Sequence, residues 1–329
     1  MPWLALVVIL GVAGLMGLVL VTSQTPSRPP LPNPNGYDDF IKASKAIARS
    51  ADDPSLIDLD HERLRVWVAT NAEPLCLLRA GLNRLCAMPV EAALTNANMN
   101  QLADMKKLAH LLIAEGRLRE LDNQPADAAR SYTDLIRFGN EISRGGWLIT
   151  RLVGIACEAL GCRALAQVVP RLGREDVRLE LRDLEKIDAG RVTWGEVREN
   201  ERYFTRRQLR KYWNPLVWVV AWWQNRQALQ GTETKHKLIV ARERLVAIEL
   251  ALRAYQSERG RPPTRLDDLV TNYLSRVPSD PFTAQPMVYR SQATNWLLYS
   301  VGPDGKDDGG APAGRGSQAK GDVRFDSSW

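Results

Sequence analysis

At 329 residues the chain is longer than a single hydrophobic core usually supports, so we expect two folded parts. A composition of 45% hydrophobic and 25% charged residues excludes wholesale disorder and a polytopic membrane protein. The net charge of +6 is too small to indicate nucleic acid binding unless a surface patch concentrates it.

The N-terminal segment is uncharged from Trp3 to Thr22, and these twenty residues are enough to cross about 30 Å of hydrocarbon as a helix. They predict a transmembrane anchor over residues 1–23. A cleaved signal peptide is the alternative, but no Lys or Arg precedes the run, which also exceeds a usual signal-peptide core. Residues 24–36 are a proline-rich linker that favours an extended spacer.

The first basic residues after the anchor are Arg28, Lys42 and Lys45. A strict positive-inside interpretation would leave the body of the protein in the cytoplasm. However, Asp38 and Asp39 lie among these residues, and long domains are translocated largely regardless of charge. The basic residues therefore leave the orientation open.

Residues 37–230 are predicted to form an α-helical domain, because apolar residues recur at spacings of three and four. Within it, Gly116, Ala128 and Tyr132 are spaced as in one tetratricopeptide-type helical hairpin, although any antiparallel helix pair has similar small residues. The apolar stretch from Trp147 to Val169 is interrupted by charged residues, which predicts a buried core helix and not a second membrane span.

Four cysteines are compatible either with disulfides, as two local pairs, or with buried thiols, and they form no zinc pattern: Cys76, Cys86, Cys157 and Cys162. The three histidines, His61, His110 and His236, are widely separated, and no catalytic or phosphate-binding motif accompanies them. We therefore expect no enzymatic activity.

Two minor interpretations concern the same residue types. Cys76 or Cys86 together with His61 would be the only nucleophile pair, and buried structural cysteines are much commoner. His236 stands between Lys235 and Lys237, so it is expected to be a solvated helix residue.

Basic residues followed by tryptophans mark the stretch from Arg202 to Arg226. This is the composition of a segment that lies at the surface of an anionic membrane. The alternative, which we favour, is that the tryptophans pack into the core or onto a partner. Single-stranded nucleic acid is a third and weaker interpretation. The candidate membrane-interface residues are Arg206, Arg207, Arg210, Lys211, Trp218, Trp222 and Trp223.

Residues 235–329 are predicted to be a small α+β domain. An apolar stripe from Lys237 to Glu258 predicts one amphipathic helix, which Gly260 and the following prolines end. A short second helix is expected at 265–273 with Thr264 as its cap, and strands are expected at 287–290 and 296–301. A helix packed on a small antiparallel sheet is the simplest arrangement of these elements.

Several short motifs follow one another in this region: Ala251-Leu-Arg-Ala-Tyr255, Gly260-Arg-Pro-Pro263, Leu266-Asp-Asp-Leu269, Val277-Pro-Ser-Asp-Pro281, Tyr289 and Tyr299-Ser-Val-Gly-Pro-Asp-Gly305. In this order they resemble the globular domain of the major, G-type pseudopilin of type II secretion. The resemblance extends from about Lys235 to the C-terminus. It implies a body on the outer side of the inner membrane and a role in secretion-related assembly.

The segment from Gly302 to Gly310 combines aspartates with glycines, which places oxygen ligands on a backbone that curls readily around a hard cation. On residues alone, an acidic solvated turn remains the alternative, and Arg315 and Lys320 offer countercharge without any ion. The resembling family binds calcium here. This implies a ligand set made of the side chains of Asp304 and Asp322 and the backbone carbonyls of Ser300 and Val301, with Asp307 as a further candidate.

The N-terminus departs from the pseudopilin pattern. Pseudopilins have a basic leader, a processing site of Gly followed by Phe or Met, and a Glu five residues into the mature helix, and none of these is found here. A pseudopilin filament would also have to accommodate the preceding helical domain. We therefore expect an accessory or unrelated membrane-bound role.

Together these patterns predict a mostly α protein with a C-terminal α+β domain. Its parts are an anchor (1–23), a linker (24–36), a helical domain (37–230) and a pseudopilin-like domain (235–329). We expect a non-enzymatic, single-pass inner-membrane protein, with its body on the periplasmic or outer side, that binds a protein partner such as secretion or pilus-type machinery. The alternative is a helical scaffold that docks on membrane lipid or a membrane protein. Nucleic acid is not an expected partner.

Overall fold

The computed structural model describes residues 30–48, 60–89, 97–209, 215–311 and 321–325. These residues are mostly helical and contain a small two-stranded antiparallel sheet, as the sequence predicts. The predicted anchor, residues 1–23, lies outside the described residues, and so does the linker up to residue 29.

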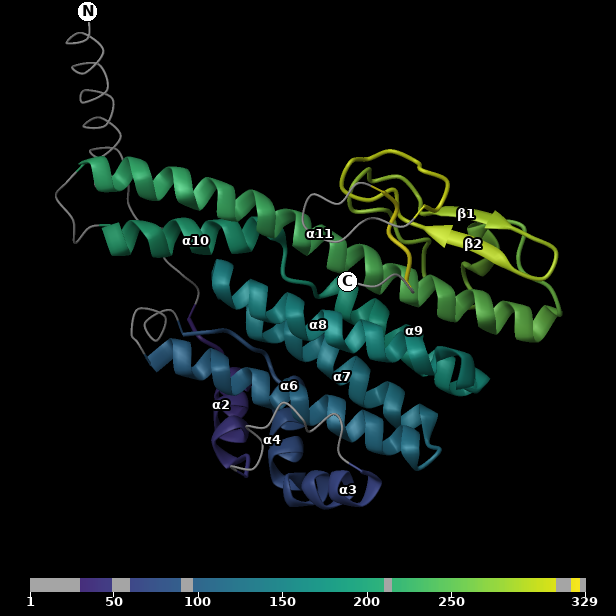
Figure 1. The fold of residues 1–329 in the computed structure, drawn as a ribbon, viewed down its shortest axis with the longest axis horizontal. Coiled ribbons are helices and arrows are strands. Elements are labelled where there is room, and N and C mark those ends of the chain that lie inside the picture. Colours follow the sequence, from purple (N-terminus) through teal and green to yellow (C-terminus); the bar gives the residue numbers. More distant parts are fainter. Residues whose placement is uncertain (1–29, 49–59, 90–96, 210–214, 312–320, 326–329) are drawn as a thin grey trace, which may run out of the picture.

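Three short helices form one end of the helical body (Figure 1): α2 (Gly36–Ala46), α3 (His61–Thr70) and α4 (Ala72–Leu82). The side chain of Asn35 accepts a hydrogen bond from the amide of Tyr37 and so caps the start of α2. Helices α2 and α4 approach closely, because a Cβ atom on Gly36 would lie 2.4 Å from the carbonyl oxygen of Gly81.

The next two helices, α6 (Ala97–Leu121) and α7 (Pro125–Ser143), form an antiparallel hairpin. The ring of Tyr132 lies directly against Gly116, where an added Cβ atom would be 2.2 Å from the ring atom Cε1. Ala128 is fully buried in the same contact region. The antiparallel helix pair that the spacing indicates is therefore present.

Helix α8 (Leu148–Val168) packs against α7 through glycines on both helices. A Cβ atom on Gly154 would lie 2.3 Å from the carbonyl oxygen of Gly139, and one on Gly161 would lie 2.8 Å from that of Tyr132. Backbone thus meets backbone along this interface. The short 3-10 turn η3 (Val169–Arg171) ends the helix.

Among the described residues, the helical stretch Leu148–Arg171 is long and apolar enough to cross a membrane, with a mean hydropathy of 1.6. Half of its most apolar window is buried inside the protein, where α8 contacts α6, α7 and α11. It also carries the fully buried charged side chains of Arg151 and Glu158. These contacts are those of the predicted core helix.

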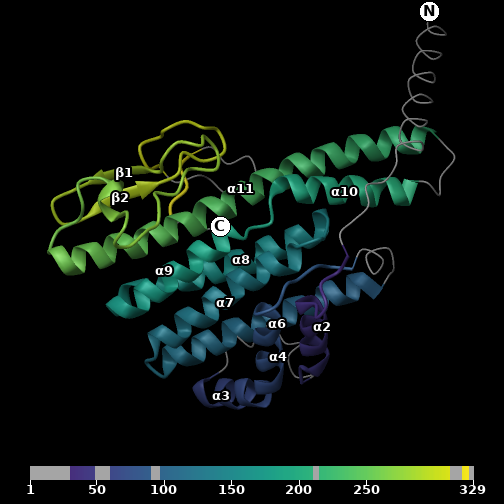
Figure 2. The ribbon, with the colours of Figure 1, turned by 180° about the vertical axis from the view of Figure 1, so that it is seen from behind.

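Helices α9 (Arg174–Ala189), α10 (Trp194–Leu209) and α11 (Pro215–Arg259) complete the helical part. Helix α11 is continuous over 45 residues, or about 67 Å at 1.5 Å per residue, and it crosses α8 and α9. In both views α10 lies beside the first half of α11 (Figure 1, Figure 2). The predicted helix at 237–258 is the second half of α11, and the expected domain boundary at 230–235 falls inside this helix.

The C-terminal elements lie on the second half of α11, on the side away from α8. Strands β1 (Val288–Ser291) and β2 (Trp296–Tyr299) pair antiparallel, with Val288 opposite Tyr299. The predicted helix at 265–273 is wrong in extent, because only the 3-10 turn η4 (Leu266–Leu269) forms. Thr264 does not cap it either: its hydroxyl and amide both donate to the Asp268 carboxylate.

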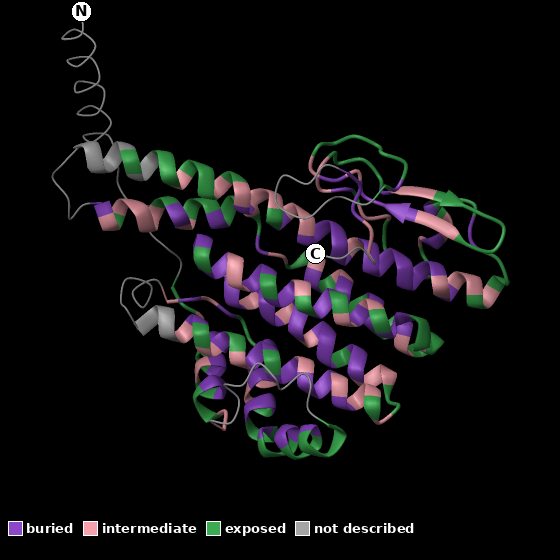
Figure 3. Ribbon diagram, in the orientation of Figure 1, coloured by how far each residue is buried: buried purple, intermediate pink, exposed green. Residues whose placement is uncertain are grey.

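Buried residues follow the inner faces of the helices (Figure 3). One hydrophobic cluster lies among α2, α3, α4, α6, α7 and α8. A second one contains residues of α7, α8, α9 and α11 together with C-terminal residues such as Leu298 and Val323. The C-terminal α+β region and the helical body therefore share one continuous core.

Candidate functional site

The segment from Gly302 to Gly310, called the aspartate-glycine loop below, closes against the end of the sheet. Ser300 and Val323 exchange two backbone hydrogen bonds of 2.9 and 2.8 Å, so the last described residues lie beside the chain leaving β2. The amide of Asp322 donates to the carbonyl of Ala311 at 2.8 Å. A Cβ atom on Gly302, whose φ is +73°, would lie 2.3 Å from the carbonyl of Gly321, so the closure requires glycine at position 302.

Asp322 is fully buried inside this loop. Its Oδ2 accepts a hydrogen bond of 2.6 Å from the amide of Gly310, whereas its Oδ1 receives none of normal geometry from the described residues. Burial raises the pKa of Asp322, against the opposing effect of the Gly310 and Asp308 amides. A buried carboxylate oxygen without a partner is the feature that a bound cation would satisfy.

The other predicted ligands differ in how free they are. Asp304 is exposed and, among the described residues, accepts a 3.3 Å hydrogen bond from the Lys306 amide. Asp307 is already engaged by the Tyr299 hydroxyl at 2.6 Å and by Arg290 at 3.1 Å, and these contacts lower its pKa. The carbonyl of Ser300 accepts a hydrogen bond from the Val323 amide. Val301 is held through its amide, which donates to Asp280, and its carbonyl takes no part in this bond.

The described residues contain no group of three or more His, Cys, Asp or Glu side chains placed to hold a metal. A cation at this loop would therefore depend on Asp322, Asp304 and backbone carbonyls. Asp280, a residue not predicted as part of the site, is buried and accepts hydrogen bonds from the amides of Val301 and Phe282. It joins the loop before β1 to the aspartate-glycine loop, and its place in the Val277–Pro281 motif was the available signal.

The arginine and tryptophan residues lie where α10 and α11 run side by side. Arg206 is half-buried and Arg207 is exposed on α10, and on α11 Val220 is 54% and Trp223 57% exposed. The side-chain amide of Asn225 on α11 donates a 3.2 Å hydrogen bond to the hydroxyl of Thr205 on α10 and so connects the two helices. Arg210 and Lys211 lie outside the described residues, as do the side chains of Trp218 and Trp222.

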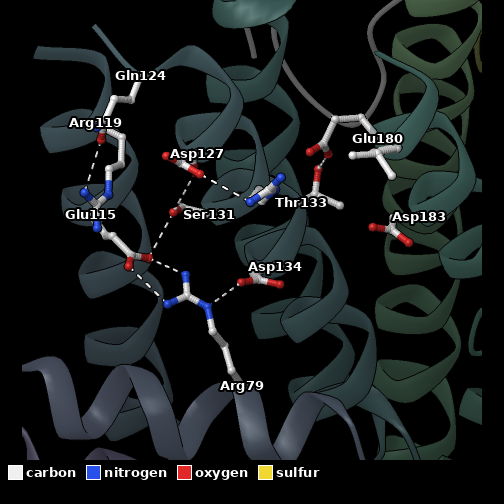
Figure 4. A pocket seen from close by; sticks show the side chains of 12 residues that line it. Arg79, Glu115, Arg119, Gln124, Asp127, Ser131, Thr133, Asp134, Glu180 and Asp183 are labelled. Atoms are coloured by element: carbon white, nitrogen blue, oxygen red, sulfur yellow. Dashed lines mark hydrogen bonds and ion pairs between the residues drawn. The ribbon is translucent and has the colours of Figure 1, made fainter. Parts of the chain in front are cut away.

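A polar pocket of about 590 Å³ lies among α4, α6, α7 and α9 (Figure 4). Arg79 of α4 makes a two-point contact with Glu115, at 3.1 and 2.5 Å, and donates to Asp134 at 2.9 Å. Glu180 of α9 is 3% exposed and accepts a 2.5 Å hydrogen bond from the Thr133 hydroxyl. Burial raises the pKa of Glu180 to about 7. The sequence analysis missed this pocket, because its residues come from four separate helices.

Charged side chains also meet in the interior near α8. Arg151 contacts Glu158 and donates from Nε to Nδ1 of His236 at 3.0 Å. The expectation that His236 is solvated is therefore wrong: it is 7% exposed, and burial together with the Arg151 charge lowers its pKa to about 3. Its position on α11 turns it towards α8, a relationship that the neighbouring lysines do not reveal.

The cysteines are free, so the disulfide alternative does not hold in this structure. Cys86, Cys157 and Cys162 are buried, and burial raises the pKa of each thiol. Cys86 points to the carbonyls of Gly81 and Arg84, whereas His61 contacts Asp122 at 2.7 Å. The nucleophile pair is therefore not assembled.

Comparison with protein-family models, with curated proteins and with solved structures finds no match for this chain.

Proposed function

We propose that the protein is a membrane-anchored, non-enzymatic envelope protein whose C-terminal region, similar to a G-type pseudopilin, binds a protein partner in secretion-related assembly. The main support is the burial of Asp322 beside Gly310, which closes an aspartate-glycine loop over the sheet and the long helix α11. The order of the motifs from Ala251 to Gly305 supports the same proposal. In this proposal the protein crosses the inner membrane once, and its body lies on the periplasmic or outer side.

Calcium is the proposed ligand of this loop, held by Asp322, Asp304 and backbone carbonyls. Oδ1 of Asp322 accepts no hydrogen bond from the part of the chain that the structure describes, and this supports calcium, since a hard cation favours carboxylate and carbonyl oxygens. The test is thermal unfolding of the full chain in detergent, with calcium or with a chelator. Calcium is expected to raise Tm by several degrees, because a ligand at a hundredfold excess over its Kd contributes about 2.7 kcal/mol.

Two substitutions and one control sharpen this test. Asp322→Asn and Asp304→Asn are expected to remove the calcium-dependent rise in Tm. Asp267→Asn changes an exposed acid of η4 and is expected to leave it intact. If Tm of the unaltered chain is the same with calcium and with chelator, the calcium site is rejected.

The proposed orientation has its own test. A reporter fused to the C-terminus, active only outside the cytoplasm, is expected to be active in cells. A matched fusion of a reporter active only in the cytoplasm is expected to be silent. The reverse pattern would place the body in the cytoplasm and contradict the envelope role.

A second candidate function is docking on anionic lipid through the surface of α10 and α11. The observation that favours it is the pair of exposed apolar side chains Val220 and Trp223 beside the exposed Arg207. Liposome flotation of the chain without residues 1–23 tests it. Replacing Arg206, Arg207, Arg210 and Lys211 by Gln should abolish binding.

The matched control for flotation removes the same charge from an exposed face of α9, at Arg174, Arg178, Arg182 and Lys186. Flotation of this control at the unaltered level is expected if the α10 and α11 surface is the docking site. If both variants lose flotation equally, lipid binding depends on net charge and not on the α10 and α11 surface. If the unaltered chain does not float with liposomes, lipid docking is rejected.

A further inference from the structure

The polar pocket shown in Figure 4 is the larger part of a longer groove on the helical body. A second cavity of about 380 Å³ adjoins it and shares Thr133, Asp134 and Asp183 with it. The two cavities follow α7 and α9, with α4 forming the opposite wall. Their combined length along two helices suits an extended chain segment better than a single ion.

The floor of this groove carries more negative than positive charge. Glu115, Asp134 and Glu180 supply three carboxylates, and Arg79 supplies the one guanidinium that contacts them. Glu115 is well covered by Arg79 and by the Ser131 hydroxyl at 2.9 Å. Burial raises the pKa of Asp134 in spite of its contact with Arg79. The charge of Arg137, which lines the second cavity, also opposes this rise. Among the described residues, however, Arg79 is the one basic side chain that forms an ion pair with these three carboxylates.

Glu180 shows this deficit most directly. It is almost completely buried, and its one hydrogen bond from the described residues comes from the neutral hydroxyl of Thr133 to Oε2. A buried carboxylate is stabilised by an ion pair or by several donors. Among the described residues Glu180 has one neutral donor and no ion pair, and the charge of Arg130 offsets only part of the effect of burial on its pKa. Glu180 nevertheless lines the cavity, so its carboxylate borders the space that an entering group would fill.

The basic residues of the rim do not fill this role. Arg119 is directed to Gln124 at 3.2 Å, and Arg130, with a side chain 60% exposed, pairs with Asp127 at 3.3 Å. On the other side, Lys186 pairs with Asp183 at 2.8 Å and is also exposed. The rim thus carries both charges, while the floor stays acidic.

We propose that this groove binds the guanidinium or ammonium group of an Arg or Lys side chain on an extended segment of a partner protein, with Glu180 and Asp134 as the accepting carboxylates. A guanidinium presents its donors in a planar fork, so one group can reach two carboxylates at once. The mixed charges of the rim suit a segment that carries an acidic residue beside its cation.

This inference rests on the proposed role in protein interaction and deepens it by naming the chemistry of the partner. It assigns the contact to the helical body, away from the aspartate-glycine loop. The pocket volume of about 590 Å³ is many times the roughly 30 Å³ that one water molecule takes, which favours a side chain over a single ion. The described residues around it also form no cluster of three metal-binding side chains.

The test uses the full chain in detergent and two capped pentapeptides, Gly-Gly-Arg-Gly-Gly and the same peptide with neutral citrulline in place of arginine. Calorimetric titration at low salt is expected to show at least about tenfold tighter binding of the arginine peptide. Equal affinities, or no binding of either peptide at concentrations on the order of 10 mM, would overturn the proposal.

Variants locate the contact. Glu180→Gln keeps the shape and the acceptor for Thr133, and it is expected to weaken binding of the arginine peptide about tenfold. Glu175→Gln alters an exposed residue of the same helix, with an 80% exposed side chain, and is expected to have no effect. Unchanged binding to Glu180→Gln refutes the assignment. Should that variant not fold, Asp134→Asn is measured instead.

Two further outcomes separate this inference from the proposed function. If the arginine peptide does not bind but calcium still raises Tm, the peptide-binding groove is rejected and the proposed function is not affected. Peptide binding without any calcium effect would reject the calcium site and keep the groove. Saturable binding of Mn²⁺ that requires Glu180, with no peptide binding, would replace the proposal by a metal site.

Discussion

Arg151 and Glu158 stand two helical turns apart on α8, are both fully buried, and form a two-point ion pair with distances of 2.5 and 3.0 Å. Arg191, from the loop before α10, contacts the same carboxylate at 3.2 Å and also pairs with Glu243 of α11. His236 accepts the remaining donor, Nε of Arg151. This network connects α8 to α11 through the middle of the core.

Removing Glu158 is expected to be strongly destabilising, because Glu158→Gln takes the ion-pair partner from the buried guanidinium of Arg151. It also removes one of the three acidic partners of Arg191. The expected loss in free energy of unfolding is about 3–5 kcal/mol. Urea denaturation of the full chain measures it. Glu175→Gln, which breaks only the surface pair with Arg178, is expected to cost less than about 1 kcal/mol. Similar small losses in both variants would show that the buried pair contributes little.

His236 is expected to make stability depend on acidic pH. Burial, and after it the Arg151 charge, lowers its pKa from 6.5 to about 3. The unfolded chain thus takes up a proton near pH 6.5, and the folded chain does not until about pH 3. The contribution of His236 is complete above pH 6.5 and is lost as pH falls toward 3.

Between pH 6.5 and about pH 5 we expect this residue to lower the free energy of unfolding by about 2 kcal/mol. Urea denaturation across this range compares the unaltered chain with His236→Gln, which should show a flatter dependence. His61→Gln, at the exposed contact with Asp122, serves as the control and should keep the slope. Parallel curves for the unaltered chain and His236→Gln would contradict the prediction.

Glu180 is expected to act in the opposite direction. Its pKa is raised from 4.5 to about 7, mainly by burial, so the folded chain holds the proton more tightly than the unfolded chain. Its contribution to stability is complete below pH 4.5 and is lost as pH rises through about 7. At about pH 8, Glu180→Gln is therefore expected to be more stable than the unaltered chain by about 2–3 kcal/mol.

The measurement is the difference in free energy of unfolding between Glu180→Gln and the unaltered chain at acidic and at alkaline pH. The difference should grow with pH, and Glu175→Gln should show no such growth. A variant that is less stable at alkaline pH would mean that the ionised Glu180 is already well satisfied in the folded chain.

Replacement by alanine is expected to have opposite effects on stability at Gly154, which is closely packed, and at Gly231, which is not. A Cβ atom on Gly154 would lie 2.3 Å from the backbone carbonyl oxygen of Gly139, and this carbonyl cannot move without separating α7 from α8. Gly154→Ala is therefore expected to lower the free energy of unfolding by about 1–3 kcal/mol or more. Gly231, inside α11, has nothing within 4 Å of that position. Gly231→Ala is expected to stabilise the chain by about 0.5–1 kcal/mol. Thermal unfolding compares them, and a neutral Gly154→Ala would contradict the close packing.

The parts that were predicted correctly depend on neighbours in the sequence. The spacing of Gly116 and Tyr132 indicated the α6 and α7 hairpin, and two runs of strand-type residues, 287–290 and 296–301, placed both strands to within a residue or two. Local signals failed where a residue turns inward to meet a distant one. His236 looked solvated because its flanking lysines are polar, yet its partner Arg151 is 85 residues away.

The sequence by itself determined the helical body, the small antiparallel sheet and the composition of the aspartate-glycine loop, because periodicity and turn residues act over a few positions. Only the tertiary structure decided that Asp322 is buried, that Glu180 lies in an acidic groove, and that the C-terminal region shares its core with α8 and α9. These features arise from contacts between distant segments. Their energies depend on burial, which local patterns do not encode.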